Sequence, residues 1–162
     1  MIILTDSCPI CNSKNIDINN IEYDLPKIGK SILYVFKCND CNYKSSEIIP
    51  LTEKDPVRIE IKVDNKDKFK KIILRSPYAI INLKEIEMDI YPGIDSKFEI
   101  KAVDDFINSV KDKLEEIKIL YHGEEYNKVI EKIKYLEEVL ENKKELTIII
   151  DDEKGYSTIY NY

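Results

Sequence analysis

The sequence has little of what enzymes commonly use in their active sites. Tryptophan is absent, the 162 residues include four glycines, and His122 is the one histidine. Four dispersed glycines form no Gly-rich phosphate loop, and one histidine next to Gly123 gives no visible catalytic triad. We expect Gly123 to cap the C-terminus of one helix, where a protonated His122 interacts with the helix dipole. We interpret Asp151 and Asp152 as a polar turn rather than a cation site. The sequence therefore predicts no catalytic function.

Long apolar runs and an excess of positive charge are also missing. No stretch approaches the roughly eighteen apolar residues of a membrane helix, and residues 1–6 carry neither a basic segment nor a cleavage site, so we expect a cytoplasmic protein. The chain has 25 Lys and Arg against 31 Asp and Glu, a formal charge of −6. A general affinity for polyanions is therefore not expected.

What the sequence does contain is enough apolar material for a folded core. Hydrophobic residues make up 43% of the chain and charged residues 35%, which argues against disorder. A length of 162 residues fits one core with a small additional module. We expect two parts, residues 1–50 and residues 51–162.

Four cysteines, all within the first 41 residues, form two CxxC pairs separated by 26 residues. Four thiolates placed two by two at tight turns can converge on a tetrahedral zinc ion. The alternatives are disulfides, in three possible connectivities, or a redox pair, but a cytoplasmic chain disfavours the first and a redox motif needs one pair. A catalytic zinc keeps an open coordination position, which four cysteines do not leave. The sequence thus predicts one structural zinc ion, with the ligands Cys8, Cys11, Cys38 and Cys41.

Each CxxC pair is followed directly by an asparagine, Asn12 or Asn42. Such turns commonly need a left-handed residue at this position, and asparagine is the non-glycine residue that tolerates it best. Residues 15–24 and 31–37 are expected to be strands joined by a turn at 26–29. The sequence therefore predicts a zinc ribbon whose hairpin extends beyond the metal site.

The rest of the chain changes its pattern twice. Residues 57–63 alternate between apolar and charged side chains, as a strand with one buried face does. Apolar residues then recur every three or four positions, which predicts a helical hairpin inserted at about 102–142. The remaining strands are expected at 72–75, 79–83, 87–90, 146–150 and 157–160. The expected fold class is mainly β (α+β).

Several short strings resemble the zinc-finger ZPR family. They are Cys8-Pro9-Ile10-Cys11, Pro26-Lys27-Ile28-Gly29, Cys38-Asn39-Asp40-Cys41-Asn42-Tyr43-Lys44, Glu85 with Pro92-Gly93, and Asp151-Asp152 with Gly155 and Ser157. The likeness covers nearly the whole chain and is that of a single-module, archaeal-type member. The chain departs from the family pattern in several places. Asparagine replaces the glycine in both CxxC turns, which we call knuckles, Lys84 replaces a proline, and Glu153 and Tyr156 replace the proline and asparagine of the last turn. Lys101-Ala102-Val103-Asp104-Asp105 stands where the family has Thr-Thr-Val-Glu-Gly.

The resemblance implies an antiparallel β domain of the double-stranded β-helix type with a helical-hairpin insertion, beside the four-cysteine ribbon. It also implies a function, because eukaryotic relatives bind translation elongation factor one-alpha, a GTPase, through the zinc module and assist its folding. We therefore expect a protein-binding chaperone or assembly factor.

Apolar residues of the ribbon are the candidates for the partner surface, although the same side chains could instead pack the ribbon itself. Nucleic-acid binding by a ribbon of the transcription or translation machinery is the alternative function. From Cys8 to Pro50, however, five lysines face five acids and no arginine occurs, which disfavours tracking of phosphates. The candidate partner residues are Ile28, Ile32, Tyr34, Phe36 and Tyr43.

Overall fold

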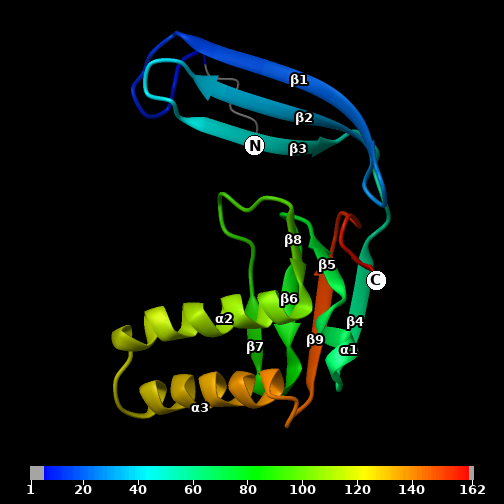
Figure 1. Ribbon diagram of the computed structural model, residues 1–162, viewed down its shortest axis with the longest axis vertical. Coiled ribbons are helices and arrows are strands. Elements are labelled where there is room, and N and C mark those ends of the chain that lie inside the picture. Colours follow the sequence, from blue (N-terminus) through cyan, green and yellow to red (C-terminus); the bar gives the residue numbers. More distant parts are fainter. Residues whose placement is uncertain (1–5, 161–162) are drawn as a thin grey trace. The chain divides into compact units, whose positions relative to one another are not determined.

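The structure is a computed structural model that describes residues 6–160 (Figure 1). The chain divides into two units, Met1–Glu53 and Lys54–Tyr162. The sequence analysis placed this boundary after residue 50, three positions earlier. Residues 1–5, which the predicted first part includes, and residues 161–162 lie outside the described range. Among the residues described, no helix is both long and apolar enough to cross a membrane.

The first unit is an antiparallel sheet of three strands, β1 (Ile16–Leu25), β2 (Gly29–Cys38) and β3 (Lys44–Pro50), in the order β1-β2-β3. The β1–β2 hairpin is paired without interruption from Ile16–Cys38 to Leu25–Gly29. Its turn passes through Lys27, whose φ of 68° is left-handed. Both knuckles lie at the end of the sheet where β1 begins and β2 ends. The third strand was not predicted.

The second unit, called the β domain below, contains two antiparallel sheets. One sheet has the order β4-β9-β6-β7 and the other β10-β5-β8. The strands are β4 (Val57–Val63), β5 (Ile72–Arg75), β6 (Ile80–Leu83), β7 (Met88–Ile90), β8 (Glu99–Ala102), β9 (Leu146–Asp152) and β10 (Thr158–Tyr160). The expected mainly β fold with antiparallel sheets is confirmed.

Strand β9 lies inside its sheet, between β4 and β6. Its residues from Leu146 to Ile150 are all buried, which explains why all of them except Thr147 are apolar, without alternation. β4, at the edge, keeps the predicted alternation, with Ile61 and Val63 buried and the charged Arg58, Glu60 and Lys62 exposed. A continuous apolar pattern therefore indicates the interior strand β9, and an alternating pattern indicates the edge strand β4.

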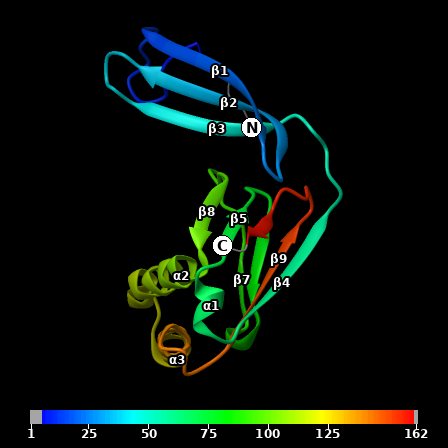
Figure 2. The same cartoon turned by 45° about the vertical axis from the view of Figure 1, so that its right-hand side comes forward.

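Two long helices, α2 (Val103–Ile117) and α3 (Gly123–Leu140), lie side by side against one side of the β domain (Figures 1 and 2). The short helices are α1 (Lys66–Phe69), η1 (Lys84–Ile86) and η2 (Lys118–Leu120). The apolar stripes of α2 and α3 join the β-domain core, as their spacing predicts. The buried stripe residues are Val103, Phe106, Ile107, Val110, Leu114, Val129, Ile133, Leu136 and Val139.

The expected roles of His122 and Gly123 are wrong. α2 ends at Ile117 and is followed by η2, so Gly123 does not cap it. His122 is instead the N-cap residue of α3, without a side-chain capping hydrogen bond, and Gly123 opens that helix with a φ of +60°. The turn between the helices is longer than the sequence suggested because η2 separates the end of α2 from the start of α3.

Candidate metal centre

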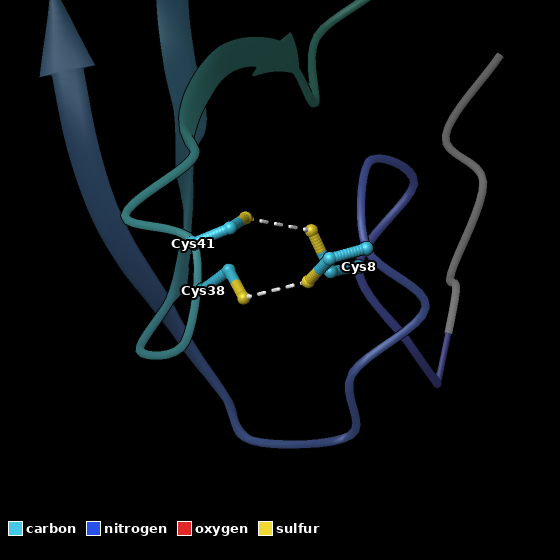
Figure 3. A group of neighbouring side chains, drawn as sticks. Cys8, Cys38 and Cys41 are labelled. Atoms are coloured by element: carbon cyan, nitrogen blue, oxygen red, sulfur yellow. Dashed lines mark hydrogen bonds between the residues drawn. The ribbon is translucent and has the colours of Figure 1, made fainter.

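The four cysteine sulfurs meet at the knuckle end of the ribbon. Cys8 and Cys11 lie in the loop before β1, Cys38 ends β2, and Cys41 lies in the turn before β3. All four Sγ atoms lie within 4.8 Å of one another, and two pairs face each other at 3.6 Å (Figure 3). These closest pairs are Cys8 with Cys41 and Cys11 with Cys38.

This spacing fits a metal ion and not a disulfide. A tetrahedron with metal–sulfur bonds of about 2.3 Å has sulfurs about 3.8 Å apart, whereas a disulfide needs about 2.05 Å. The four cysteines form no disulfide within residues 6–160. Cys8 and Cys38 are buried and Cys11 and Cys41 are exposed, so the site lies at the surface of the ribbon with one side covered.

The backbone of each knuckle is bent as the sequence predicts. Asn12 has a φ of 57° and Asn42 a φ of 59°, both left-handed. The first bend lets the backbone N–H of Asn12 donate to the carbonyl of Cys8 at 2.8 Å, and the N–H of Ile10 approach Sγ of Cys8 at 3.5 Å. In the second knuckle, the N–H of Cys38 donates to the carbonyl of Tyr43 at 2.8 Å. The two loops therefore hold the sulfurs in position through their own backbone.

The pKa values of the thiols differ strongly within the cluster. Burial is the largest influence on Cys8 and raises its pKa, but backbone hydrogen bonds from Cys11 and Ile10, with the neighbouring thiols, lower it to about 7. For Cys41, a backbone hydrogen bond from Tyr43 lowers the pKa, but burial and three neighbouring thiols raise it to about 12. Four adjacent thiols thus resist ionising together, and a divalent cation supplies the charge that holds all four as thiolates.

A group of polar side chains ties the two knuckles together. Asp40 accepts hydrogen bonds from Oγ of Ser13 at 2.5 Å and Nδ2 of Asn15 at 2.8 Å, and these bonds lower the pKa of its carboxyl. Asn39 donates to Asp17 at 3.0 Å. Sequence reasoning did not find this group, because its members are 22 to 27 positions apart and meet through the pairing of β1 with β2.

The candidate partner residues do not form one exposed surface. Phe36 is buried beside Cys8 and Cys38, with its ring centroid 6.1 Å from that of Tyr43. Ile28 is also buried, and Ile32, Tyr34 and Tyr43 are half-buried. Phe36 therefore packs the metal site, and in this conformation neither it nor Ile28 offers a side chain to a partner.

Two exposed apolar side chains of the ribbon, Ile21 and Tyr23, lie on the face of its sheet opposite to Phe36, whereas the exposed Ile18 pairs with Phe36 and shares its face. Ile21, Leu33 and Ile48 are in register across all three strands, and we call this set the outer row. Successive side chains of a strand point to opposite faces, so Leu33 points away from the face of Phe36 and Cys38. Ile21 is 43% exposed, and Tyr23, two positions along on the same face, is 50% exposed.

Comparison with known proteins places this architecture in a family. Residues 67–162 match the ZPR1 jelly-roll domain. The chain belongs to the ZPR1 family. This is the family that the sequence resemblance indicated, and the match covers most of the β domain.

Similar proteins extend the likeness to the ribbon. A ZPR1-like protein of Pyrococcus horikoshii is 31% identical over 94% of this chain and 70% of the relative. A ZPR1-like protein of Methanocaldococcus jannaschii is 27% identical over 94% of this chain and 78% of the relative. The zinc finger chaperone zpr1 of Schizosaccharomyces pombe is 25% identical over 96% of this chain, which spans 35% of that protein. The chain thus corresponds to a single zinc-binding ZPR1-type module, and the four-sulfur site is consistent with the zinc finger in the name of the Schizosaccharomyces pombe relative.

Two hallmark strings of the ZPR1 resemblance have structural roles in the β domain. Glu85, in η1, accepts from the backbone N–H of Thr147 at 2.6 Å and from its hydroxyl at 2.7 Å. Burial raises the pKa of Glu85, but these two bonds outweigh it and lower the pKa. Glu85 therefore fastens η1 to the start of β9.

The Asp151-Asp152 turn is the second such string. Asp152 is 2% exposed and accepts from the backbone N–H groups of Lys154, Tyr156 and Ser157 and from the hydroxyl of Ser157, at 2.7 to 3.0 Å. The side chain of Asp151 is 44% exposed and pairs with Arg58 at 2.8 Å. The two carboxylates are thus engaged separately by the protein, as the interpretation of a polar turn expects.

Proposed function

We propose that this ZPR1 module binds translation elongation factor one-alpha through its zinc ribbon and assists the folding of that GTPase. The observation that carries the proposal is the match of 96% of the chain, ribbon and β domain together, to a relative named a zinc finger chaperone. The proposal assigns no catalytic step to the module. It also needs no nucleic acid, in keeping with the balanced charge of the ribbon.

The outer row supports the proposal physically. A chaperone that recognises an incompletely folded domain needs exposed apolar side chains on a rigid support, and aromatic residues are enriched in such contacts. Ile21 and Tyr23 meet this need on β1, whose residues between its two ends are all exposed. The long β1–β2 hairpin holds them in register with Leu33. We therefore assign the partner surface to the outer row and Tyr23 rather than to the face of Phe36.

The test is refolding of denatured elongation factor one-alpha in the presence of the zinc-loaded module, with the yield of GTP-binding protein as the measurement. The intact module should raise this yield. The double variant Ile21→Ser, Tyr23→Ser should lose the gain while keeping one bound zinc ion per chain, because both side chains point away from the sulfurs. Replacing Cys8 by Ser should remove both the gain and the zinc.

Tyr91→Ser is the matched control, because Tyr91 is 66% exposed but belongs to the β domain. It should refold the partner as well as the intact module does. No gain from the intact module over the Cys8→Ser variant would reject the chaperone function. A gain that survives in the double variant would reject the assignment of the surface and leave the chaperone function standing.

A further inference from the structure

The β domain contains a cleft that the proposed function does not use. It lies where the outer strands of the two sheets, β7 and β8, approach α2, and its volume is about 290 Å³. The walls are largely apolar, formed by Phe106, Val110 and Leu114 of α2 with Met88 and Ile90 of β7. A concave apolar site with a few converging polar groups is the usual form of a small-molecule site.

The charged residues of the cleft are mainly positive, in a chain whose net charge is −6. Arg75, Lys101 and Lys113 line it together with a single acid, Glu99. Lys101 pairs with Glu99 at 2.5 Å, and Lys113 pairs with Glu116 at 2.8 Å. Within residues 6–160, Arg75 makes no ion pair and one hydrogen bond, from Nη2 to the carbonyl of Ala79 at 3.1 Å.

Arg75 therefore differs from the other cations of the cleft. Its guanidinium is half-buried, and burial lowers its pKa, although the nearby Glu99 acts in the opposite direction. The group stays charged, since arginine does not lose its proton in proteins, and most of its five N–H donors have no acceptor within the described residues. The chain has two arginines, and the other one, Arg58, is exposed and paired with Asp151.

We propose that this cleft binds a small organic acid that carries one carboxylate on an aromatic or branched apolar body. The planar fork of Arg75 matches a carboxylate with two parallel hydrogen bonds, which a point charge such as lysine does not offer. The apolar body lies against Phe106, Val110 and Leu114. One unpaired cation calls for a singly charged ligand, and the volume accommodates roughly a dozen non-hydrogen atoms.

The experiment titrates the full-length, zinc-loaded, ¹⁵N-labelled protein with phenylbutyrate and, separately, with the neutral phenylbutyramide. Phenylbutyrate should shift the amide signals of α2 and β8 saturably and bind roughly tenfold more tightly than the amide, the usual effect of a charge-assisted pair. Arg75→Gln should reduce the affinity for the acid to that for the amide. Ser109→Trp, which places a large side chain at the wall of the cleft, should weaken both.

Arg58→Gln is the matched control and should leave both affinities unchanged. Arg75→Lys keeps the charge without the fork, so it should bind the acid with intermediate affinity and unfold at the same temperature as the intact protein. Equal affinity for the acid and the amide would overturn the proposal. So would the absence of saturable shifts with a folded protein, or an equal loss in the Arg58→Gln and Arg75→Gln variants.

Discussion

Asp152 illustrates how a charged residue becomes part of the core. Its side chain is buried, and burial raises the pKa of the carboxyl, but hydrogen bonds led by those of Ser157 outweigh this and lower the pKa. Hydrogen bonds from backbone N–H groups to a carboxylate are among the strong ones, at about 1.5–3 kcal/mol each. The ionised form is therefore the one that the folded turn requires.

Replacing Asp152 by Asn should destabilise the β domain by about 2–3 kcal/mol at pH 7, because the carboxamide has one accepting oxygen where the turn presents several donors. The folded-state pKa of Asp152 lies below the unfolded-state value near 4. Its stabilisation is thus complete above about pH 4 and is lost as the pH falls through the folded-state pKa. Urea unfolding at pH 7, 4 and 3 should show a shallower acid dependence in the variant.

Asp151→Asn is the control for this measurement. Its carboxylate is exposed and pairs with Arg58, and exposed pairs contribute at most about 1 kcal/mol. If Asp151→Asn lowered the free energy of unfolding as much as Asp152→Asn, the role assigned to the buried carboxylate would be contradicted.

Gly155 occupies the same turn and should not tolerate a side chain. Its φ is +70°, and a Cβ there would lie 2.0 Å from the carbonyl oxygen of Asp55. Gly155→Ala should therefore lower the free energy of unfolding by about 2 kcal/mol or more, because both strain and a backbone clash oppose it. In Gly93→Ala, the new Cβ lies 3.8 Å from its nearest neighbour. Calorimetry should therefore give this variant nearly the same free energy of unfolding as the intact protein.

At the residue scale, the metal ligands could be predicted from the sequence and their surroundings could not. The two CxxC pairs and the left-handed Asn12 and Asn42 depend on spacing along a few residues, which the sequence displays directly. The bonds of Asp40 and the burial of Phe36 depend on the register of β1 with β2. A one-residue change in that register would move Phe36 to the other face of the sheet.

Among the elements, α2 begins without a capping side chain. Its N-cap residue is Ala102, with the extended φ of −65° and ψ of 154° that a capping serine or threonine adopts. Two acids in the first turn, Asp104 and Asp105, compensate in part through the helix dipole. The family string that this segment resembles has threonine at the corresponding place.

Ala102→Thr should therefore stabilise the β domain by about 1 kcal/mol, because the new hydroxyl can accept a hydrogen bond from the backbone N–H of Asp104. The N–H of Val103 already donates to the carbonyl of Lys71, and that of Asp105 to Oδ1 of Asp104. Ala102→Val has the same shape without the oxygen and should give no such gain. Thermal unfolding of the two variants isolates the effect of the hydroxyl. Equal melting temperatures would show that the dipole already satisfies this end of the helix.

The elements themselves were predictable where their pattern is periodic. The bounds expected for β4 and β5 match those observed, and the helical hairpin expected at about 102–142 is present as α2 and α3. β3 and β8 were missed, since Lys44–Pro50 and Glu99–Ala102 lack a clear alternation of apolar and polar residues. Their pairing partners in the sheets decide their conformation, and local sequence does not display those partners.

At the scale of the whole molecule, the two units differ greatly in the size of their cores. The core of the β domain contains nineteen buried residues, whereas the ribbon cluster contains three, two of them the metal ligands Cys8 and Cys38. A module with so little apolar burial depends on metal binding for its folding free energy. The β domain has no such dependence.

Removal of zinc by a chelator should therefore unfold the ribbon and leave the β domain folded. In a ¹H–¹⁵N spectrum of the full chain, amide signals of residues 6–53 should collapse toward random-coil positions while those of 54–160 stay in place. Cys38→Ser should give the same spectrum without a chelator. Loss of the β-domain signals as well, or precipitation of the chain, would mean that the two units share one cooperative core.

Glu85 and Asp152 form hydrogen bonds within the β domain, and the backbone around Gly155 is crowded. These features affect how members of the family can change their binding partners. These residues, which make the chain recognisable, direct their polar groups inward and leave the outward side chains of β1 unconstrained by them. Selection for a new partner can therefore act on positions such as Ile21 and Tyr23 without weakening the scaffold. Two chains that share the hallmark strings share an architecture, and under the proposed assignment of the partner surface their binding specificities depend on a different set of residues.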